Sequence, residues 1–308
     1  MEAVIEIQNV TKQIKGRKII DQISFEVNRG EVFGFLGPNG AGKTTTIRMI
    51  VGLIGITEGD IKIAGHSIRT DFEKAVSHVG AIVENPEMYK FMSGYDNLLH
   101  FARMSAKVTK EKIDEVVELV GLTDRIKDKV KTYSLGMRQR LGLAQCLLHD
   151  PDVLILDEPT NGLDPAGIRE IRDHIRMLAR ERNMAVIVSS HLLSEMEMMC
   201  DRIGIIQQGK LVDVQFVHDF INGAEKVYQF ELIEKEKAKE LLKQSHPQLS
   251  VEITSVGVTM AMTREEIPAV VKIFVSEDIS LYGIEEVTKS LEERFLEITK
   301  EKEGVAHV

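Results

Sequence analysis

Gly37-Pro38-Asn39-Gly40-Ala41-Gly42-Lys43-Thr44 matches the phosphate-loop pattern G-x-x-x-x-G-K-[ST] at every fixed position. The apolar run over residues 31–36 predicts a buried strand before it, and residues 44–50 predict a helix after it. A strand that breaks into glycines and restarts as a helix directs several backbone N–H groups at one point, together with the positive end of the helix dipole. This stretch therefore predicts a site for a nucleotide polyphosphate.

The loop also assigns individual contacts to that nucleotide. Lys43 is expected to reach the β- and γ-phosphates, and the Thr44 hydroxyl is expected to ligate Mg²⁺. The residues predicted to contact the nucleotide in this stretch are Gly37, Asn39, Gly40, Ala41, Gly42, Lys43, Thr44 and Thr45. A glycine-rich turn that matched by chance would not be expected to carry the lysine, the threonine and both flanking elements.

Length and composition limit the remaining possibilities. The chain has 308 residues, enough for about two domains, and its net charge of −9 excludes a basic nucleic-acid footprint at the level of the whole chain. No apolar stretch reaches the roughly 18 residues that a membrane span needs, and the Met1-Glu2-Ala3 start lacks the basic region of a secretory signal. We therefore expect any membrane role to depend on a partner protein. Cys146 and Cys200 lie in apolar helical stretches and are expected to be reduced core thiols.

The order of expected elements predicts the fold class. Up to about residue 215, apolar strands alternate with helices, which indicates an α/β domain with a largely parallel sheet covered on both faces. A helical stretch over residues 85–150 forms a subdomain within this first domain, residues 1–215. Composition changes near residues 215–224, and residues 216–308 then predict a smaller α+β domain. Its expected order is β-α-β-β-α-β, the split unit of ferredoxin-like domains, followed by a closing helix over residues 289–300.

A second informative stretch ends in two acids. Val153-Leu154-Ile155-Leu156 is a continuous apolar run, typical of a strand buried on both faces, and Asp157-Glu158 follows it directly. Such a strand delivers carboxylates to the edge of the sheet where ligands bind in open α/β folds. In a nucleotide site, Asp157 would hold Mg²⁺ through water and Glu158 would polarise the attacking water. The alternative is an ordinary acid pair at the start of a surface helix.

With these two stretches, further motifs give the sequence a resemblance to the ATP-binding subunits of ABC transporters over residues 1–215. Tyr133-Ser134-Leu135-Gly136-Met137-Arg138-Gln139-Arg140 resembles the family's signature sequence, and its Ser134 and Gly136 are expected to lie before a helix over residues 138–148. Asn161-Gly162-Leu163-Asp164 resembles the D-loop, and Ser189-Ser190-His191 resembles the switch region with its histidine. The resemblance implies a P-loop NTPase of ABC type that binds ATP with Mg²⁺ and hydrolyses it.

The resemblance also implies roles for residues outside the phosphate loop. Ser134 and Gly136 would contact the γ-phosphate bound by a second subunit, in a dimer joined head to tail around two ATP molecules. His191 would contact the γ-phosphate of its own subunit. Asp164 would act both as a helix cap and as a contact across the dimer. Read without their neighbours, Ser134 is equally consistent with a simple helix cap, and His191 with an ordinary histidine at a helix start.

Three positions depart from the family pattern. Ile14 stands where the family commonly stacks an aromatic ring on the adenine, so an apolar and weaker base contact is expected. Glu84 stands where the family has the glutamine of the Q-loop; it could still bind Mg²⁺ or its water, but it brings negative charge near the triphosphate. Leu135 replaces the first glycine of the signature. Because the main catalytic positions are retained, hydrolysis is still expected.

Two stretches are similar to a particular branch of these ATPases. The segment over residues 79–97 resembles the bacitracin- and lantibiotic-resistance branch, and the tail over residues 289–298 is similar to the ending of drug and antibiotic exporters; that tail is equally consistent with a plain amphipathic helix. The resemblance implies an ATPase that powers a separately encoded polytopic permease exporting a drug, antibiotic or antimicrobial peptide, as a homodimer bound at the cytoplasmic face of the membrane. The alternative is a soluble ABC ATPase of the assembly, regulatory, translation or repair type, with no transport step.

Overall fold

The computed structural model describes residues 2–104, 108–222, 226–246 and 249–287. The chain forms two compact units, Met1–Val217 and His218–Val308. The domain boundary drawn from composition, between residues 215 and 216, lies two residues before this division. Each unit has a hydrophobic core of its own.

The first unit contains two sheets. A four-stranded antiparallel sheet has the order β2-β1-β4-β5, and a six-stranded sheet has the order β10-β9-β3-β8-β7-β6. The strands are β1 (Ala3–Ile14), β2 (Arg17–Asn28), β3 (Val32–Leu36), β4 (Glu58–Ile63), β5 (His66–Ser67), β6 (Val79–Ile82), β7 (Val153–Asp157), β8 (Ala185–Ser190), β9 (Arg202–Gln207) and β10 (Lys210–Phe216). All neighbours in the larger sheet are parallel except β9 and β10, which confirms the predicted largely parallel sheet.

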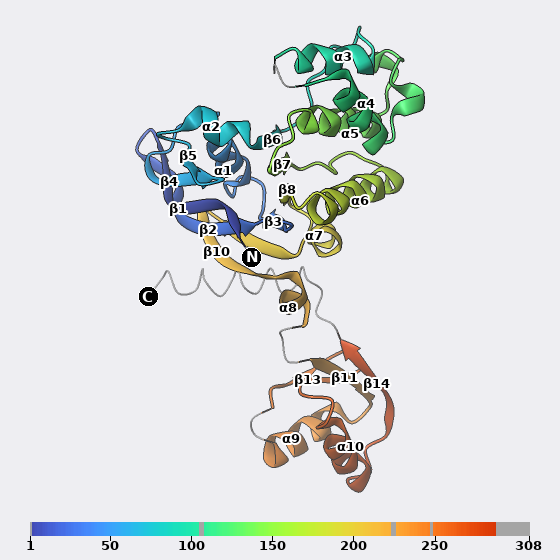
Figure 1. The fold of residues 1–308 in the computed structure, drawn as a ribbon. Helices are drawn as coiled ribbons and strands as arrows, with labels where there is room; N and C mark the ends of the chain where they lie inside the picture. The colour runs from blue at the N-terminus through green and yellow to red at the C-terminus, as the bar shows by residue number, and fades with distance from the viewer. Residues whose placement is uncertain (1, 105–107, 223–225, 247–248, 288–308) are drawn as a thin grey trace. The chain divides into compact units, whose positions relative to one another are not determined.

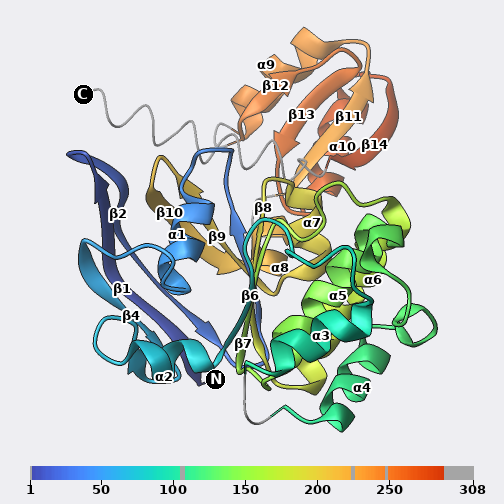
Figure 2. The same ribbon diagram turned by 90° about the horizontal axis from the view of Figure 1, so that it is seen from above.

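Helices cover both faces of the larger sheet, which explains why its central strands are apolar throughout. Every residue of β3, β7 and β8 is buried. Helix α1 (Lys43–Ile50) lies between the two sheets and shares a core with Phe33 and Phe35 (Figures 1 and 2). On the opposite face, Gly34 lies against α7 (Leu193–Met199), and α6 (Pro165–Glu181) packs beside it. The carboxyl ends of β3, β7 and β8 therefore meet at one edge, next to α1.

The helical subdomain lies between β6 and β7 in the chain. It contains α3 (Gly94–Ala102), α4 (Lys110–Leu119) and α5 (Leu135–Leu147), while the short α2 (Phe72–Ser77) precedes β6. Ser134 caps α5 because its hydroxyl accepts a hydrogen bond from the Met137 N–H at 3.2 Å. The helix therefore begins at Leu135, three residues before the predicted start. The expectation that Gly136 lies before the helix was wrong, since it is the second residue of α5.

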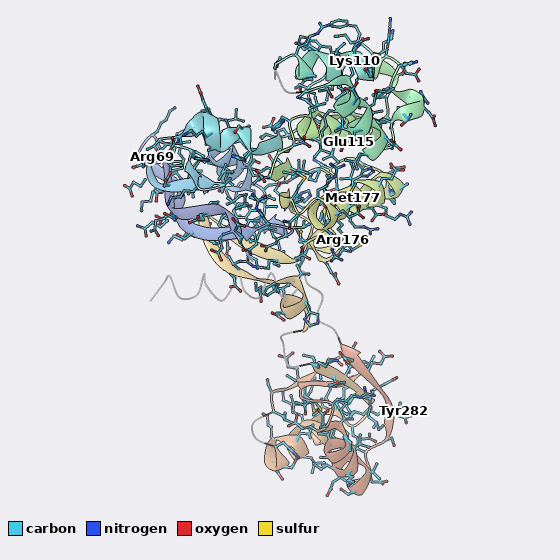
Figure 3. The ribbon with its side chains drawn as sticks, in the orientation of Figure 1. Arg69, Lys110, Glu115, Arg176, Met177 and Tyr282 are labelled. Atoms are coloured by element: carbon cyan, nitrogen blue, oxygen red, sulfur yellow. The ribbon has the colours of Figure 1, made fainter. Side chains whose placement is uncertain are left out.

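The second unit has the predicted split β-α-β-β-α-β order. Its elements are β11 (Val227–Leu232), α9 (Lys235–Ser245), β12 (Val251–Ile253), β13 (Gly257–Ala261), α10 (Ile267–Ser276) and β14 (Leu281–Val287), preceded in the chain by α8 (Val217–Asn222). The sheet order is β12-β13-β11-β14 and every pair is antiparallel, so β13 is inserted between the strands that flank α9. This confirms the ferredoxin-like arrangement. Tyr282 is exposed on the edge strand β14 (Figure 3), and the predicted closing helix over residues 289–300 lies outside the described residues.

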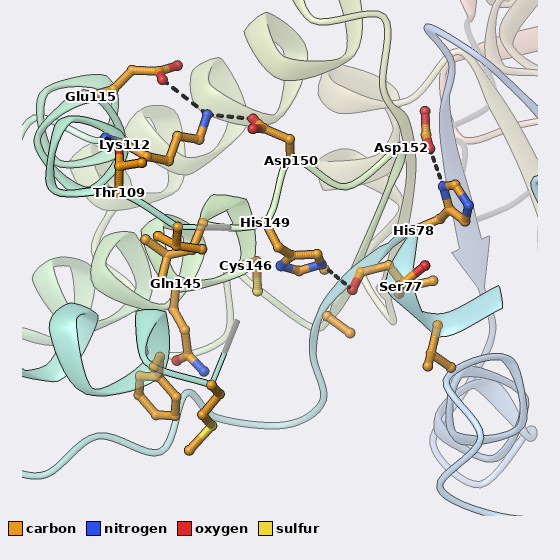
Figure 4. Close-up of a pocket in the computed structure, with 18 of the residues that line it drawn as sticks. Ser77, His78, Thr109, Lys112, Glu115, Gln145, Cys146, His149, Asp150 and Asp152 are labelled. Carbon is orange, nitrogen blue, oxygen red and sulfur yellow. Dashed lines mark hydrogen bonds and ion pairs between the residues drawn. The ribbon is translucent and has the colours of Figure 1, made fainter. Parts of the chain in front are cut away.

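An ion-pair cluster joins three segments at the amino-terminal edge of the larger sheet. Asp152, before β7, accepts from Arg29 at 2.6 Å and contacts the Nδ1 atom of His78 at 2.5 Å (Figure 4). Partial burial alone would raise the pKa of the Asp152 carboxyl, but the hydrogen bonds from Arg29 and His78 outweigh it and hold the pKa below its ordinary value of 3.8.

A pH dependence of stability follows from this lowered pKa. The ionised Asp152 carboxyl adds to the free energy of unfolding above pH 3.8, which is its pKa in the unfolded chain. This contribution is lost as the pH falls through the lower pKa of the carboxyl in the folded chain. Asp152→Asn is therefore expected to lower the free energy of unfolding at pH 7 and to reduce the loss of stability on acidification. Urea unfolding at pH 7 and at about pH 2.5, below the pKa of the unfolded carboxyl, checks this, with the exposed Glu181→Gln as control. Identical pH profiles for Asp152→Asn and the parent chain would contradict it.

Candidate functional site

The phosphate loop has the conformation that its glycines permit. It connects β3 to α1, and Gly42 adopts a φ of +116° directly before the helix. A Cβ atom on Gly42 would lie 2.5 Å from the Ile20 side chain, and one on Gly37 would lie 2.4 Å from the Ile206 carbonyl oxygen. Residues larger than glycine would push the loop away from the strands that support it. The predicted strand–loop–helix arrangement is therefore present, with α1 beginning at Lys43.

Lys43 is fixed inside this loop. Its side chain is only 5% exposed, and its ammonium donates to the carbonyl oxygens of Gly37 at 2.6 Å and Pro38 at 3.3 Å. The ammonium also lies 3.7 Å from the Oε1 atom of Glu158. Burial lowers the pKa of Lys43, and the Glu158 and Asp157 carboxylates oppose that shift. A cation held in this way is placed to bind an anion that enters the loop.

The predicted acid pair lies at the end of β7, beside the end of β8. Asp157 is buried, and it pairs in register with Ser189, whose hydroxyl donates to its Oδ1 atom at 2.6 Å. The same hydroxyl accepts from the Glu158 N–H at 3.0 Å. Glu158 has a φ of +48°, an unfavourable value for a non-glycine residue. Ser189 thus holds the turn that carries both acids, and the surface-helix alternative for this pair is wrong.

Glu158 links the phosphate loop to the switch histidine. Its Oε2 atom lies 3.2 Å from the Nδ1 atom of His191, which follows β8 and is partly exposed. Its Oε1 atom faces Lys43, so one partly exposed carboxylate lies between a cation and an imidazole. A carboxylate in this position can accept a proton from water, and the imidazole can hydrogen-bond either to it or to a phosphate oxygen. The structure therefore brings together three of the residues predicted from separate motifs.

Glu84 is placed differently from Asp157. It lies just after β6 with a φ of +69°, is 61% exposed, and forms an ion pair with Arg48 of α1. Among the residues that the structure describes, no group of three or more His, Cys, Asp or Glu side chains is arranged to hold a metal ion. The predicted magnesium ligand Glu84 is therefore paired with the Arg48 guanidinium. Within the described residues it does not form a metal-binding cluster with Asp157.

The signature and the D-loop contact one another within the chain. A Cβ atom on Gly162 would lie 3.2 Å from the Leu135 side chain, and one on Gly136 would lie 3.9 Å from the Leu163 side chain. Asp164 caps α6 by accepting from the Gly167 N–H at 3.0 Å, and Pro165 takes the first helical position. The predicted cap at Asp164 is confirmed. Ile14, the predicted adenine contact, lies at the exposed end of β1.

Sequence reasoning missed the hydroxyl groups that support the site. Ser189 was read only as part of the switch motif, although it bonds to both Asp157 and Glu158. Its register opposite Asp157 follows from the parallel pairing of two apolar strands. The available signal was a pair of serines where an otherwise apolar strand ends. Polar residues at the carboxyl ends of neighbouring parallel strands meet at one edge.

Comparison with known proteins shows the class to which this site belongs. Residues 20–161 match the family described as ABC transporter. The whole chain is 64% identical over 308 residues to the uncharacterized ABC transporter ATP-binding protein YhcH of Bacillus subtilis, covering 100% of both chains. It is 40% identical to the bacitracin transport ATP-binding protein BcrA of Bacillus licheniformis, covering 97% of this chain and 98% of that one. The chain belongs to the ATP-binding proteins of ABC transporters.

A solved structure agrees with this assignment. An ATP-binding subunit of an ABC transporter matches with a TM-score of 0.64 and 25% sequence identity, covering 71% of this chain and 92% of that chain. The resemblance drawn from the phosphate loop, signature, D-loop and switch is therefore confirmed at the level of the family. The protein is an ATPase of the ABC class that binds ATP.

Proposed function

We propose that this chain hydrolyses ATP to power a separately encoded membrane permease that exports an antibiotic, drug or antimicrobial peptide. The observation that carries the proposal is the Lys43–Glu158–His191 arrangement at the phosphate loop, with separations of 3.7 Å and 3.2 Å. The relatives support the export reading: BcrA is named a bacitracin transport protein, and SrtF of Streptococcus pyogenes, 41% identical over 210 residues that cover 68% of this chain and 89% of that one, is named a lantibiotic transport protein. Family membership counts against the non-transport alternative.

Each residue at the site has a defined task in this proposal. The loop amides over residues 37–45 and the Lys43 ammonium bind the phosphates, and Ile14 contacts the adenine. Glu158 accepts a proton from the attacking water, and His191 orients that water and the γ-phosphate. The buried position of Lys43 and the fixed turn at Glu158 support these assignments, because both residues already lie at the phosphate loop. When phosphates bind, the Lys43 ammonium exchanges the carbonyl oxygens of Gly37 and Pro38 for phosphate oxygens.

Mg²⁺ fits the oxygen atoms at this edge. The Thr44 hydroxyl and the Asp157 carboxylate are hard oxygen ligands, the type that Mg²⁺ prefers, and most of its remaining ligands come from phosphates and water in sites of this kind. When bound, Mg²⁺ neutralises charge on the phosphates. Asp157 is held for this task by the Ser189 hydroxyl. Glu84 joins the metal site only if it exchanges its partner Arg48 for the ion or its water.

The Arg48–Glu84 pair gives a prediction about nucleotide affinity. Arg48→Gln leaves the Glu84 carboxylate unneutralised near the triphosphate, so the KM for Mg-ATP is expected to rise about two- to fivefold, the size of an exposed ion pair. The double variant Arg48→Gln with Glu84→Gln is expected to recover the parent value. Steady-state phosphate release over a range of Mg-ATP concentrations measures this. A double variant as impaired as the single one would show that Glu84 does not act on the triphosphate.

A head-to-tail dimer completes the site in this proposal. Ser134 and Gly136 lie at the amino-terminal end of α5, where the helix dipole favours a phosphate of a second subunit. Leu135 and Leu163 bring the D-loop beside the signature, so both can face the same partner. Two copies of this chain then enclose two ATP molecules, and closure moves the permease. The energy for that movement is the difference in ATP affinity between the open and closed dimer.

An exposed apolar surface in the helical subdomain is suited to the permease. Phe91 is 71% exposed and lies edge-on to Tyr89, which also contacts the His100 ring. A neighbouring groove is lined by Leu53, Val83, Pro86 and Phe101. Within the described residues no helix is long and apolar enough to cross a bilayer. In the proposal, cytoplasmic loops of the permease occupy this surface and hold the chain at the inner face of the membrane.

Docking through this surface can be separated from catalysis. Phe91→Ser is expected to reduce the permease recovered with the tagged chain at least about tenfold, because exposed aromatic residues dominate many interfaces. ATP hydrolysis by the isolated chain is expected to stay within twofold, roughly the variation of distant surface changes. Phe216→Ser, at another exposed aromatic residue, serves as the control. Full recovery of the permease with Phe91→Ser would move the docking surface elsewhere.

Export is tested in the native cell. The chromosomal gene is replaced by the Glu158→Gln form, and growth is measured in bacitracin, a lantibiotic and linearmycin. Linearmycin is included because LnrL of Bacillus subtilis, 39% identical over 214 residues that cover 68% of this chain and 68% of that one, is named a linearmycin resistance protein. We expect a fall of at least about fourfold in the inhibitory concentration of one compound, since export of that compound stops when the motor stops. Unchanged inhibitory concentrations for all three would reject these antibiotics as cargo. Recovery of resistance by a plasmid copy of the parent gene is the control.

A further inference from the structure

A buried carboxylate lies on α7, the helix that follows His191 in the chain. Glu195 is in the first turn of α7 and is only 8% exposed. Its Oε2 atom accepts a hydrogen bond from the Thr160 hydroxyl at 2.8 Å and another from the Ser190 hydroxyl at 2.7 Å. Thr160 and Ser190 are themselves buried. A buried carboxylate is unfavourable unless it is hydrogen-bonded, so these two bonds fix its position.

The two hydroxyl groups belong to the two segments that flank Glu158. Ser190 directly precedes His191, and its hydroxyl also accepts from the Leu192 N–H at 2.9 Å, which fixes the backbone on both sides of the histidine. Thr160 begins the turn that leads to Asp164, where its carbonyl oxygen accepts from the Leu163 N–H at 3.1 Å. One oxygen atom of Glu195 therefore joins the segment of the switch histidine to the D-loop.

Burial of α7 does not require a charged residue at this position. Leu193, Met196 and Met199 already place the helix against the core. Replacing a buried charge and its partners by apolar residues is often neutral for stability. What an apolar residue could not do is accept hydrogen bonds from two segments at once. The distinctive property of Glu195 is thus the connection between those segments.

We propose that Glu195 is a positioning residue for ATP hydrolysis, which holds His191 and the D-loop in a fixed relation to Glu158. The inference rests on the roles proposed above for Glu158 and His191. Through this connection, a shift of the D-loop at the contact with a second subunit also shifts the histidine. In this role Glu195 acts through the hydroxyl groups of Thr160 and Ser190, which donate to its Oε2 atom.

The first test compares Glu195→Ala with Glu195→Gln in the full chain. Alanine removes both acceptor contacts, so kcat is expected to fall about tenfold or more, the effect of a displaced catalytic group, while the Kd for ATP changes less than about threefold. Glutamine keeps one oxygen that can accept from both hydroxyls, and is expected to restore kcat to within about threefold of the parent. Glu197→Ala, an exposed acid on the same helix, is the control and should keep the parent kcat.

A second measurement distinguishes positioning from general support of the fold. If Glu195 acts through His191, the double variant Glu195→Ala with His191→Ala should be no slower than His191→Ala alone. Multiplied losses in the double variant would overturn the proposal, and so would a parent-like kcat for Glu195→Ala. If Glu195→Ala does not fold, Thr160→Val and Ser190→Ala remove one hydroxyl each and should both lower kcat with unchanged Kd; parent-like turnover in both would also overturn it.

These outcomes are separable from failure of the proposed function. If Glu158→Gln loses turnover and Glu195→Ala does not, only the positioning role fails. If Glu158→Gln and His191→Ala both keep parent turnover, the assignment of the hydrolytic site fails, and the positioning role falls with it.

Discussion

Glu158→Gln is expected to lose ATP turnover by a factor of about 10²–10⁴, the usual contribution of a positioned general base. The amide cannot accept the proton of the attacking water, yet it has the same shape and can keep the contacts toward Lys43 and His191. The Kd for ATP is therefore expected to stay close to the parent value. Phosphate release and nucleotide titration measure the two quantities separately.

The same variant reports on the dimer. Because hydrolysis is the step that reopens the proposed pair, Glu158→Gln with ATP and Mg²⁺ is expected to sediment as a dimer, and without nucleotide as a monomer. Glu197→Gln is the matched control, because it makes the same carboxylate-to-amide change at an exposed position. Glu197 is exposed although its neighbour Glu195 is buried. Parent-like turnover in Glu158→Gln would mean that Glu158 is not the base.

Lys43→Ala is expected to weaken ATP binding about 10- to 100-fold, the value of a charge-assisted hydrogen bond. The ammonium is buried in the loop and close to two carboxylates, so its removal leaves Asp157 and Glu158 without a compensating cation near the phosphates. Their repulsion of the triphosphate would add to the loss. Isothermal titration with ATP measures the change.

The control for Lys43→Ala must account for folding, because Lys43 also bonds to the carbonyl oxygens of Gly37 and Pro38. Lys74→Ala removes an exposed lysine of α2 and should leave ATP binding unchanged. Thermal unfolding of both variants shows whether the loop variant remains folded at the titration temperature. A folded Lys43→Ala chain with unchanged ATP affinity would contradict the role of the phosphate loop.

Much of the site was predictable because each motif is local and lies at the end of a strand. The phosphate loop follows β3, Asp157 ends β7 and His191 follows β8, and these three strands are parallel neighbours. Once an alternating α/β pattern indicates a parallel sheet, their carboxyl ends must meet. The 3.2 Å contact between Glu158 and His191 then follows from two motifs more than thirty residues apart.

The remaining features depend on packing that a sequence pattern does not encode. Arg48 and Glu84 pair because α1 lies near the end of β6, which requires the placement of both elements. Glu195 is one of two acids on the short helix α7, and only the folded chain shows that it is buried while Glu197 is exposed. The start of α5 was misplaced because glycine at position 136 favours a loop, whereas the Ser134 cap determines the helix start.

In the ferredoxin-like unit too, the order of the elements was predictable from local sequence, but the contacts between distant residues were not. Alternation of apolar residues predicted its strands and helices, and their order indicated the split topology. The core contact between Phe230 and Phe274, with ring centres 5.7 Å apart, joins β11 to α10 across the unit. Which residues pair in this way was not readable from the alternation alone.

The most direct test of the central claim is recovery of the partner from native membranes. A tagged Glu158→Gln chain is captured from a detergent extract in the presence of ATP and Mg²⁺, and the bound proteins are identified by mass spectrometry. We expect a polytopic membrane protein in amounts nearly equal to the chain, and its loss when the Phe91→Ser change is added. Recovery of only ribosomal proteins, DNA-associated proteins or soluble assembly factors would contradict the account.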